Sequence, residues 1–158
     1  MNKNLIIAIV AVVAIVVVAL VVVLVGGKEE TKSMNIDAAA QTLSTTTPFS
    51  EMAMMDITTE ELSAVMGINA DNVEKVYGKF PMMNVQASMY LLIQVKEGAV
   101  DTVKTELEQY ATNYEQQWSR YLPAQYELVQ NRKVGVVGNT IYMIIAENAE
   151  ALEKSIAE

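Results

Sequence analysis

The residues best suited to binding chemistry in this 158-residue sequence are five aromatic side chains close together in its second half. They are Tyr110, Tyr114, Trp118, Tyr121 and Tyr126. Tryptophan and tyrosine dominate the binding hot spots of protein interfaces, so Tyr114, Trp118, Tyr121 and Tyr126 are candidates for a binding surface. Aromatic residues at helical spacing are more often packed in a core, with their hydroxyl groups reaching water or the backbone. Core packing is therefore the favoured interpretation, and a binding surface is the alternative.

The sequence contains neither cysteine nor histidine. This composition excludes a thiol nucleophile, a Ser-His-Asp triad and zinc sites built from cysteine or histidine. Two carboxylates could still hydrolyse a glycosidic bond, but among 19 Asp and Glu residues no pair stands out by its spacing. The oxygen donors Asn69, Asp71, Asn72 and Glu74 do not fit the calcium loop of an EF-hand, and a solvated turn is expected there. We therefore assign no catalytic residue, no metal ligand and no cofactor.

The charge of the chain argues against nucleic acid as a partner. Its formal net charge is −8 at pH 7, whereas affinity for phosphates comes from lysine and arginine. Gly135 and Gly138 have the spacing of a GxxG nucleic-acid loop, but such a loop joins helices and lies beside basic residues. A turn made easy by glycine is the better interpretation.

The N-terminal segment has the composition of a membrane-spanning helix. It begins at Leu5, ends at Val25 and consists of 21 consecutive Ala, Val, Ile and Leu residues. As a helix it would be roughly 31 Å long, which matches the ~30 Å hydrocarbon core of a bilayer. The alternative is a cleaved signal peptide, but the apolar run is longer than a usual signal core and no A-x-A site comes after it. We predict a retained anchor, with the lipid bilayer as its partner.

The positions of basic residues decide the orientation of this anchor only weakly, because Lys3 precedes it while Lys28 and Lys32 come after it. A single N-terminal anchor with a short leading tail behaves as an uncleaved signal sequence and exports the rest of the chain. The prediction is therefore a single-pass protein of the cell membrane: an anchor at residues 1–27, a flexible linker at 28–35 and one extracytoplasmic domain at 36–158.

Helical periodicity recurs through the domain. Apolar residues at helical spacing predict helices at residues 36–43, 99–121 and 149–157, and the second of these carries most of the aromatic cluster. Thr58 and Glu61 have the spacing of a capping box, which predicts the start of a further short helix.

Strand patterns complete the predicted fold. Residues 85–96 alternate between apolar and mixed positions, which predicts a strand with one buried face, and residues 73–80 are an ambiguous strand. Residues 134–146 form a predicted hairpin that turns at Gly138 and Asn139. The order of elements predicts an N-terminal transmembrane helix and then a two-layer α+β domain, with an antiparallel sheet of about four strands and helices packed on one face.

A stretch of nine residues resembles a known bacterial family. The pattern W-x-x-Y-L-P-x-Q-Y, from Trp118 to Tyr126, and the subsequent hairpin with Gly138 and Asn139 resemble the family called domain of unknown function 4358, over residues 49–158. Members of that family are typically exported, many as lipoproteins, so the resemblance implies an exported domain. This chain has no cysteine to carry a lipid, so its anchor must be the apolar segment. The family has no established activity, and the resemblance implies no site residue.

These observations favour a membrane-anchored cell-envelope protein that binds, without catalysis, to another envelope protein. The alternatives are an envelope hydrolase that uses carboxylates and an accessory subunit of a membrane complex. An enzyme should have a concave site with acids of perturbed pKa, whereas an interaction module should expose an apolar patch. Six methionines could contribute to such a patch or fill the core, at positions 52, 54, 55, 82, 83 and 89.

Overall fold

The computed structural model describes residues 32–157. The predicted anchor at residues 5–25 and half of the predicted linker lie outside the described residues, so both stay predictions. Among the helices within residues 32–157, none has the length and apolar composition needed to cross a membrane. Met34, which the sequence analysis placed in the linker, is buried in the domain.

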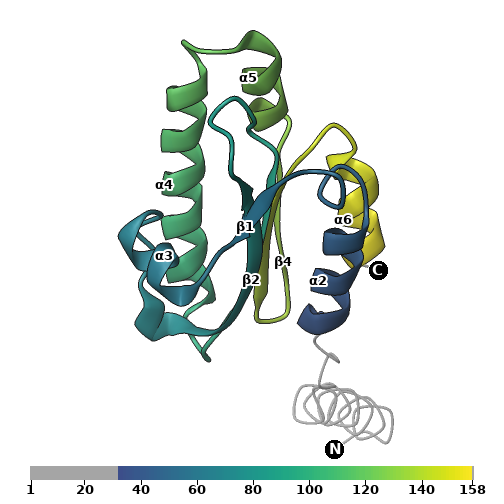
Figure 1. Ribbon diagram of the computed structural model, residues 1–158. Helices are drawn as coiled ribbons and strands as arrows, with labels where there is room; N and C mark the ends of the chain where they lie inside the picture. The colour runs from purple at the N-terminus through teal and green to yellow at the C-terminus, as the bar shows by residue number, and fades with distance from the viewer. Residues whose placement is uncertain (1–31, 158) are drawn as a thin grey trace, which may run out of the picture. The chain divides into compact units, whose positions relative to one another are not determined.

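One antiparallel sheet of five strands forms the centre of the domain (Figure 1), in the order β1-β2-β3-β5-β4. The strands are β1 (Met54–Asp56), β2 (Val73–Pro81), β3 (Met89–Val95), β4 (Lys133–Val137) and β5 (Thr140–Ile145). The predicted α+β class, the antiparallel sheet and the hairpin that joins β4 to β5 are confirmed. The strand count was too low by one, because β1 has only three residues and exists through its pairing with the end of β2.

Helices cover both faces of this sheet. They are α2 (Ile36–Thr45), α3 (Thr59–Ala64), α4 (Val100–Trp118), α5 (Pro123–Gln130) and α6 (Ala149–Ala157), with a short 3₁₀ turn η1 (Ala70–Asn72). Figure 1 shows α3, α4 and α5 on one side of the strands and α2 and α6 on the other. The prediction of two layers with helices on one face is therefore wrong, and the domain has three layers.

The central strands explain the third layer, because both of their faces are apolar. Met89, Leu91 and Ile93 of β3 belong to the core beneath α4. Tyr90 and Leu92 point the other way and belong to a second core with α2 and α6. The sequence analysis left this second face of the strand in water, yet Tyr90 is 2% exposed and Leu92 fully buried. Two apolar faces require a cover on each side.

The predicted strand at residues 85–96 begins only at Met89, since the preceding residues leave the sheet. Residues 82–88 instead form a loop that is fixed to the helices on the α4 side. The backbone N–H of Ala87 donates a hydrogen bond to Oε1 of Gln125 at 2.8 Å, and the hydroxyl of Tyr114 donates one to the carbonyl of Ala87 at 3.3 Å. These bonds hold the loop beside α4.

The start of α3 is held by the predicted capping box. The hydroxyl of Thr58 accepts a hydrogen bond from the backbone N–H of Glu61, and the Glu61 carboxylate accepts one from the N–H of Thr58 at 2.6 Å. Gly67, with φ of +70°, turns the chain after the helix. Because both ends are fixed, Val65 and Met66 keep a defined position next to α4.

Candidate functional site

Three of the four aromatic residues predicted as a binding surface lie in one row along α4 and the turn after it. We call Tyr110, Tyr114, Trp118 and Tyr121 the aromatic row. Successive ring centroids are 5.8, 6.0 and 5.7 Å apart, because residues three and four apart share one face of a helix. Tyr126 is placed on α5, where it packs against the core beneath α4 and accepts a hydrogen bond from Gln130 at 3.0 Å.

A cavity of about 140 Å³ opens between α3, α4 and the 82–88 loop. Its apolar walls are formed by Met66, Phe80, Met83, Met89, Tyr110 and Tyr114. Shallower hollows continue it along α4, one toward Gly67 and one toward Tyr121, and each shares Gln117 with it. We call these connected hollows the α3–α4 groove. An apolar cavity of ~150 Å³ is large enough for a benzene-sized group but smaller than a usual pocket for a drug-sized ligand.

Trp118 lines the cavity and carries an unusual polar group. The residue is 4% exposed, and its indole N–H is buried without a hydrogen-bond acceptor among the described residues. Such a donor costs about 1–3 kcal/mol relative to a satisfied one. A residue that lines the groove therefore carries a buried donor that would gain from an acceptor.

Most of the other polar groups of the groove are uncharged. Burial raises the pKa of Tyr110 and Tyr114. In Tyr114 the neighbouring Trp118 indole partly offsets that rise in pKa, although its N–H does not reach hydrogen-bond geometry with the phenol. Both phenols are thus neutral near pH 7. The side-chain amides of Asn84 and Gln117 line the groove and form no hydrogen bond with any residue of the described range.

The rim of the groove is apolar and exposed. The four most exposed large hydrophobic residues of the described chain are Val65, Met82, Met83 and Tyr121, and all but Met82 line the groove. Two charged residues line it, Glu61 and Arg120, which come from α3 and from the turn after α4. An exposed apolar rim around a concave, mostly apolar floor is typical of a binding site.

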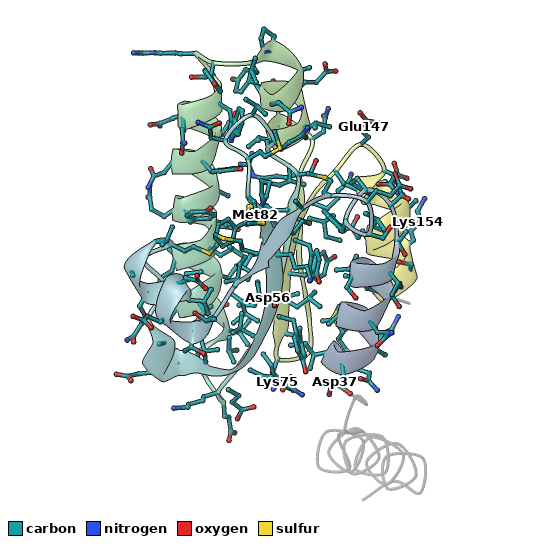
Figure 2. The ribbon with its side chains drawn as sticks, viewed as in Figure 1. Asp37, Asp56, Lys75, Met82, Glu147 and Lys154 are labelled. Atoms are coloured by element: carbon teal, nitrogen blue, oxygen red, sulfur yellow. The ribbon has the colours of Figure 1, made fainter. Side chains whose placement is uncertain are left out.

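A second, polar hollow of about 520 Å³ lies between α2 and β2, and the charged side chains along it are held in ion pairs. Oδ1 of Asp37 accepts hydrogen bonds from Lys75 and Tyr77, each at 2.6 Å, and Figure 2 shows Asp37 and Lys75 side by side. Lys79 forms a further pair with Asp56 at 3.2 Å. The Lys75 ammonium and the Tyr77 hydroxyl hold the pKa of Asp37 below its ordinary value, so this carboxylate stays ionised. A hydrolase would need a carboxyl group with a raised pKa as its general acid.

Sequence reasoning identified residues of the α4 wall of the groove but missed the walls formed by α3 and by the 82–88 loop. The aromatic spacing identified Tyr114, Trp118 and Tyr121. Val65 and Asn84 were not considered, because each meets α4 only in the folded domain. The methionine cluster was a usable signal, since Met83 and Met89 line the cavity.

Comparison with known proteins gives one match. A family model described as "Domain of unknown function (DUF4358)" matches residues 48–146. No curated protein and no solved structure matches the chain. The matched residues include all five strands and every residue that lines the α3–α4 groove, whereas α2 and α6 lie outside them.

Proposed function

The chain belongs to the family called domain of unknown function 4358, the family that the sequence resemblance indicated, and on this premise we propose that it is a membrane-anchored binding module of the cell envelope. The partner is another envelope protein, and the α3–α4 groove receives it. The observation that supports this role most directly is the exposed apolar rim of Val65, Met83 and Tyr121 around a concave floor.

The physical reason for a binding role is the free energy that would be gained when a partner buries the exposed side chains of the rim. Burying one large apolar side chain against a partner contributes about 1.5–3 kcal/mol when the burial is complete. Val65 is 66% exposed and Met83 is 58% exposed, so most of that contribution is still available to a partner. Soluble proteins rarely keep such side chains together around a hollow unless the surface has a binding role.

The location is proposed from the N-terminal segment. Residues 5–25 remain in the lipid, and the domain lies on the outer side of the cell membrane. The typical export of family members supports this orientation. The test is digestion of the domain by an added protease on intact spheroplasts, with a cytoplasmic protein as the control for lysis. A domain that resists the protease until the cells are lysed would contradict the proposed location.

The partner is tested by photocrosslinking in intact cells that carry the full chain. A photoreactive amino acid replaces Gln117, which lines the groove, or Gln116, an exposed neighbour on α4 that does not. We expect a specific adduct from position 117 and none from position 116. Equal adducts from both positions would contradict a role for the groove.

A matched pair of variants on the 82–88 loop extends this test. Met83→Gln removes an apolar side chain from the cavity rim, and we expect it to abolish the adduct. Met82→Gln makes the same change at an adjacent residue that is 62% exposed and does not line the groove, and it should leave the adduct unchanged. An adduct that survives Met83→Gln would refute the assignment of the site.

A further inference from the structure

The dimensions of the α3–α4 groove restrict what can occupy it. The cavity has room for one side chain of moderate size, and the hollows on either side extend it along α4. From Tyr110 to Trp118 the helix rises about 12 Å, at ~1.5 Å per residue. An extended peptide covers that length with roughly four residues, at ~3.3 Å each.

The aromatic row has a repeat that suits an extended chain. Its ring centroids are 5.7 to 6.0 Å apart. In an extended peptide, alternate side chains point to the same side and are spaced by about 6.6 Å. Side chains on one side of such a peptide would therefore meet the accessible rings of Tyr110, Tyr114 and Tyr121 in turn, whereas the Trp118 ring is buried between them.

The polar groups of the groove match a peptide backbone. The buried N–H of Trp118 lacks an acceptor among residues 32–157, and a peptide carbonyl would provide one. The amides of Asn84, Gln86 and Gln117 each offer donors and an acceptor, which is what alternating peptide N–H and C=O groups require. A sugar ring fits less well, because Trp118 is 4% exposed and offers little ring face, while Met66 and Phe80 would leave hydroxyl groups without partners.

Charge narrows the choice further. Among residues 32–157, the only charged group that lines the cavity is the Glu61 carboxylate, which already accepts hydrogen bonds from Thr58, and the chain as a whole has a net charge of −8. An acidic residue at the centre of a ligand would be desolvated without a basic partner, which is unfavourable. The favoured occupant is therefore neutral and has one apolar side chain at its centre.

From these contacts we infer that the α3–α4 groove binds an extended, uncharged segment of about four residues from the partner protein. The segment inserts one apolar side chain between α3, α4 and the 82–88 loop and places a backbone carbonyl on the Trp118 N–H. This inference rests on the proposed function, because it specifies what the same groove recognises.

The experiment uses the full chain in lipid nanodiscs. Trp118 is the only tryptophan, so its fluorescence reports on the groove without labelling. The probes are three acetylated and amidated pentapeptides: Ser-Thr-Leu-Thr-Ser, the same peptide with Asp in place of Leu, and the leucine peptide with an N-methylated central backbone. We expect saturable binding of the leucine peptide and at least about tenfold weaker binding of the other two, because each leaves a polar group or a charge unpaired.

Two matched variants connect the signal to the groove. Gln117→Ala should weaken binding of the leucine peptide roughly two- to tenfold, the usual effect of losing one hydrogen bond. Gln116→Ala, on the same helix but outside the groove, should leave it unchanged. Both residues are exposed, so neither variant should affect folding.

The remaining outcomes each exclude the peptide. A fluorescence change with a tetramer of N-acetylglucosamine and none with the peptides would indicate a glycan. Groove-dependent self-association in light scattering would indicate a second copy of this chain. Crosslinking from position 117 in cells without peptide binding in nanodiscs would overturn this inference and leave the proposed function standing, whereas loss of both would overturn both.

Discussion

Replacement of Trp118 by alanine tests whether this buried residue of the groove is also part of the core. Trp118 is 4% exposed and belongs to the apolar cluster beneath α4, together with Leu107 and Val129. Truncation of a buried tryptophan to alanine costs about 3–5 kcal/mol. Two features place this variant at the lower end of that range. The indole N–H is already unsatisfied, and the space that it leaves opens into an existing cavity.

We therefore expect Trp118→Ala to lower the free energy of unfolding by about 3 kcal/mol. For a domain of this size, such a loss lowers the midpoint of thermal unfolding by roughly 12 °C. Most of the variant should still be folded at 25 °C, because domains of this kind have about 5–15 kcal/mol of stability. The measurement is far-UV circular dichroism of the full chain in detergent micelles during heating and urea titration.

Tyr121→Ala is the control, because Tyr121 belongs to the same aromatic row but is 55% exposed. It should cost no more than about 0.5 kcal/mol, as surface substitutions usually do. If the two variants were equally stable, Trp118 would not be packed as described, and the argument from its buried N–H would be wrong.

Three further predictions concern the elements around the groove and the opposite face of the sheet. Thr58→Ala removes the cap of α3 and should cost about 0.5–2 kcal/mol in urea titrations, with weaker binding of the leucine pentapeptide because the α3 wall loosens. Gly135→Ala places a methyl group against the phenol of Tyr142 and should cost about 1–3 kcal/mol, so an unchanged thermal midpoint would contradict the packing of β4 on β5. Asp37→Asn removes the ion pair with Lys75, whose ammonium lowers the pKa of Asp37, so the native chain gains stability from this pair only above the ordinary carboxyl pKa. Thermal midpoints of native and Asp37→Asn chains should therefore differ near neutral pH and converge as the pH falls through the lowered pKa, and a difference that grew in acid would refute the assignment.

The sequence by itself determined the features that depend on neighbouring residues. Thr58 and Glu61 form the predicted capping box, because both partners lie within one helical turn. Gly138 takes φ of +62° in the predicted hairpin, and the aromatic spacing places Tyr114 and Trp118 on one helix face. Family membership was also readable, since it depends on a linear pattern.

Only the tertiary structure decided which surfaces meet. Periodicity at β3 identifies two alternating sets of side chains, but whether Tyr90 and Leu92 face water or a second helical layer depends on where α2 and α6 pack. The three residues of β1 are too few to give a pattern, and their pairing with β2 defines them as a strand. The groove also depends on tertiary packing, because Val65, Met83 and Trp118 are far apart in sequence and meet only when α3 and the 82–88 loop pack beside α4. Local sequence fixes the conformation of elements such as α3 and the β4–β5 turn, whereas burial of apolar surface between distant elements, which no local pattern encodes, creates the site.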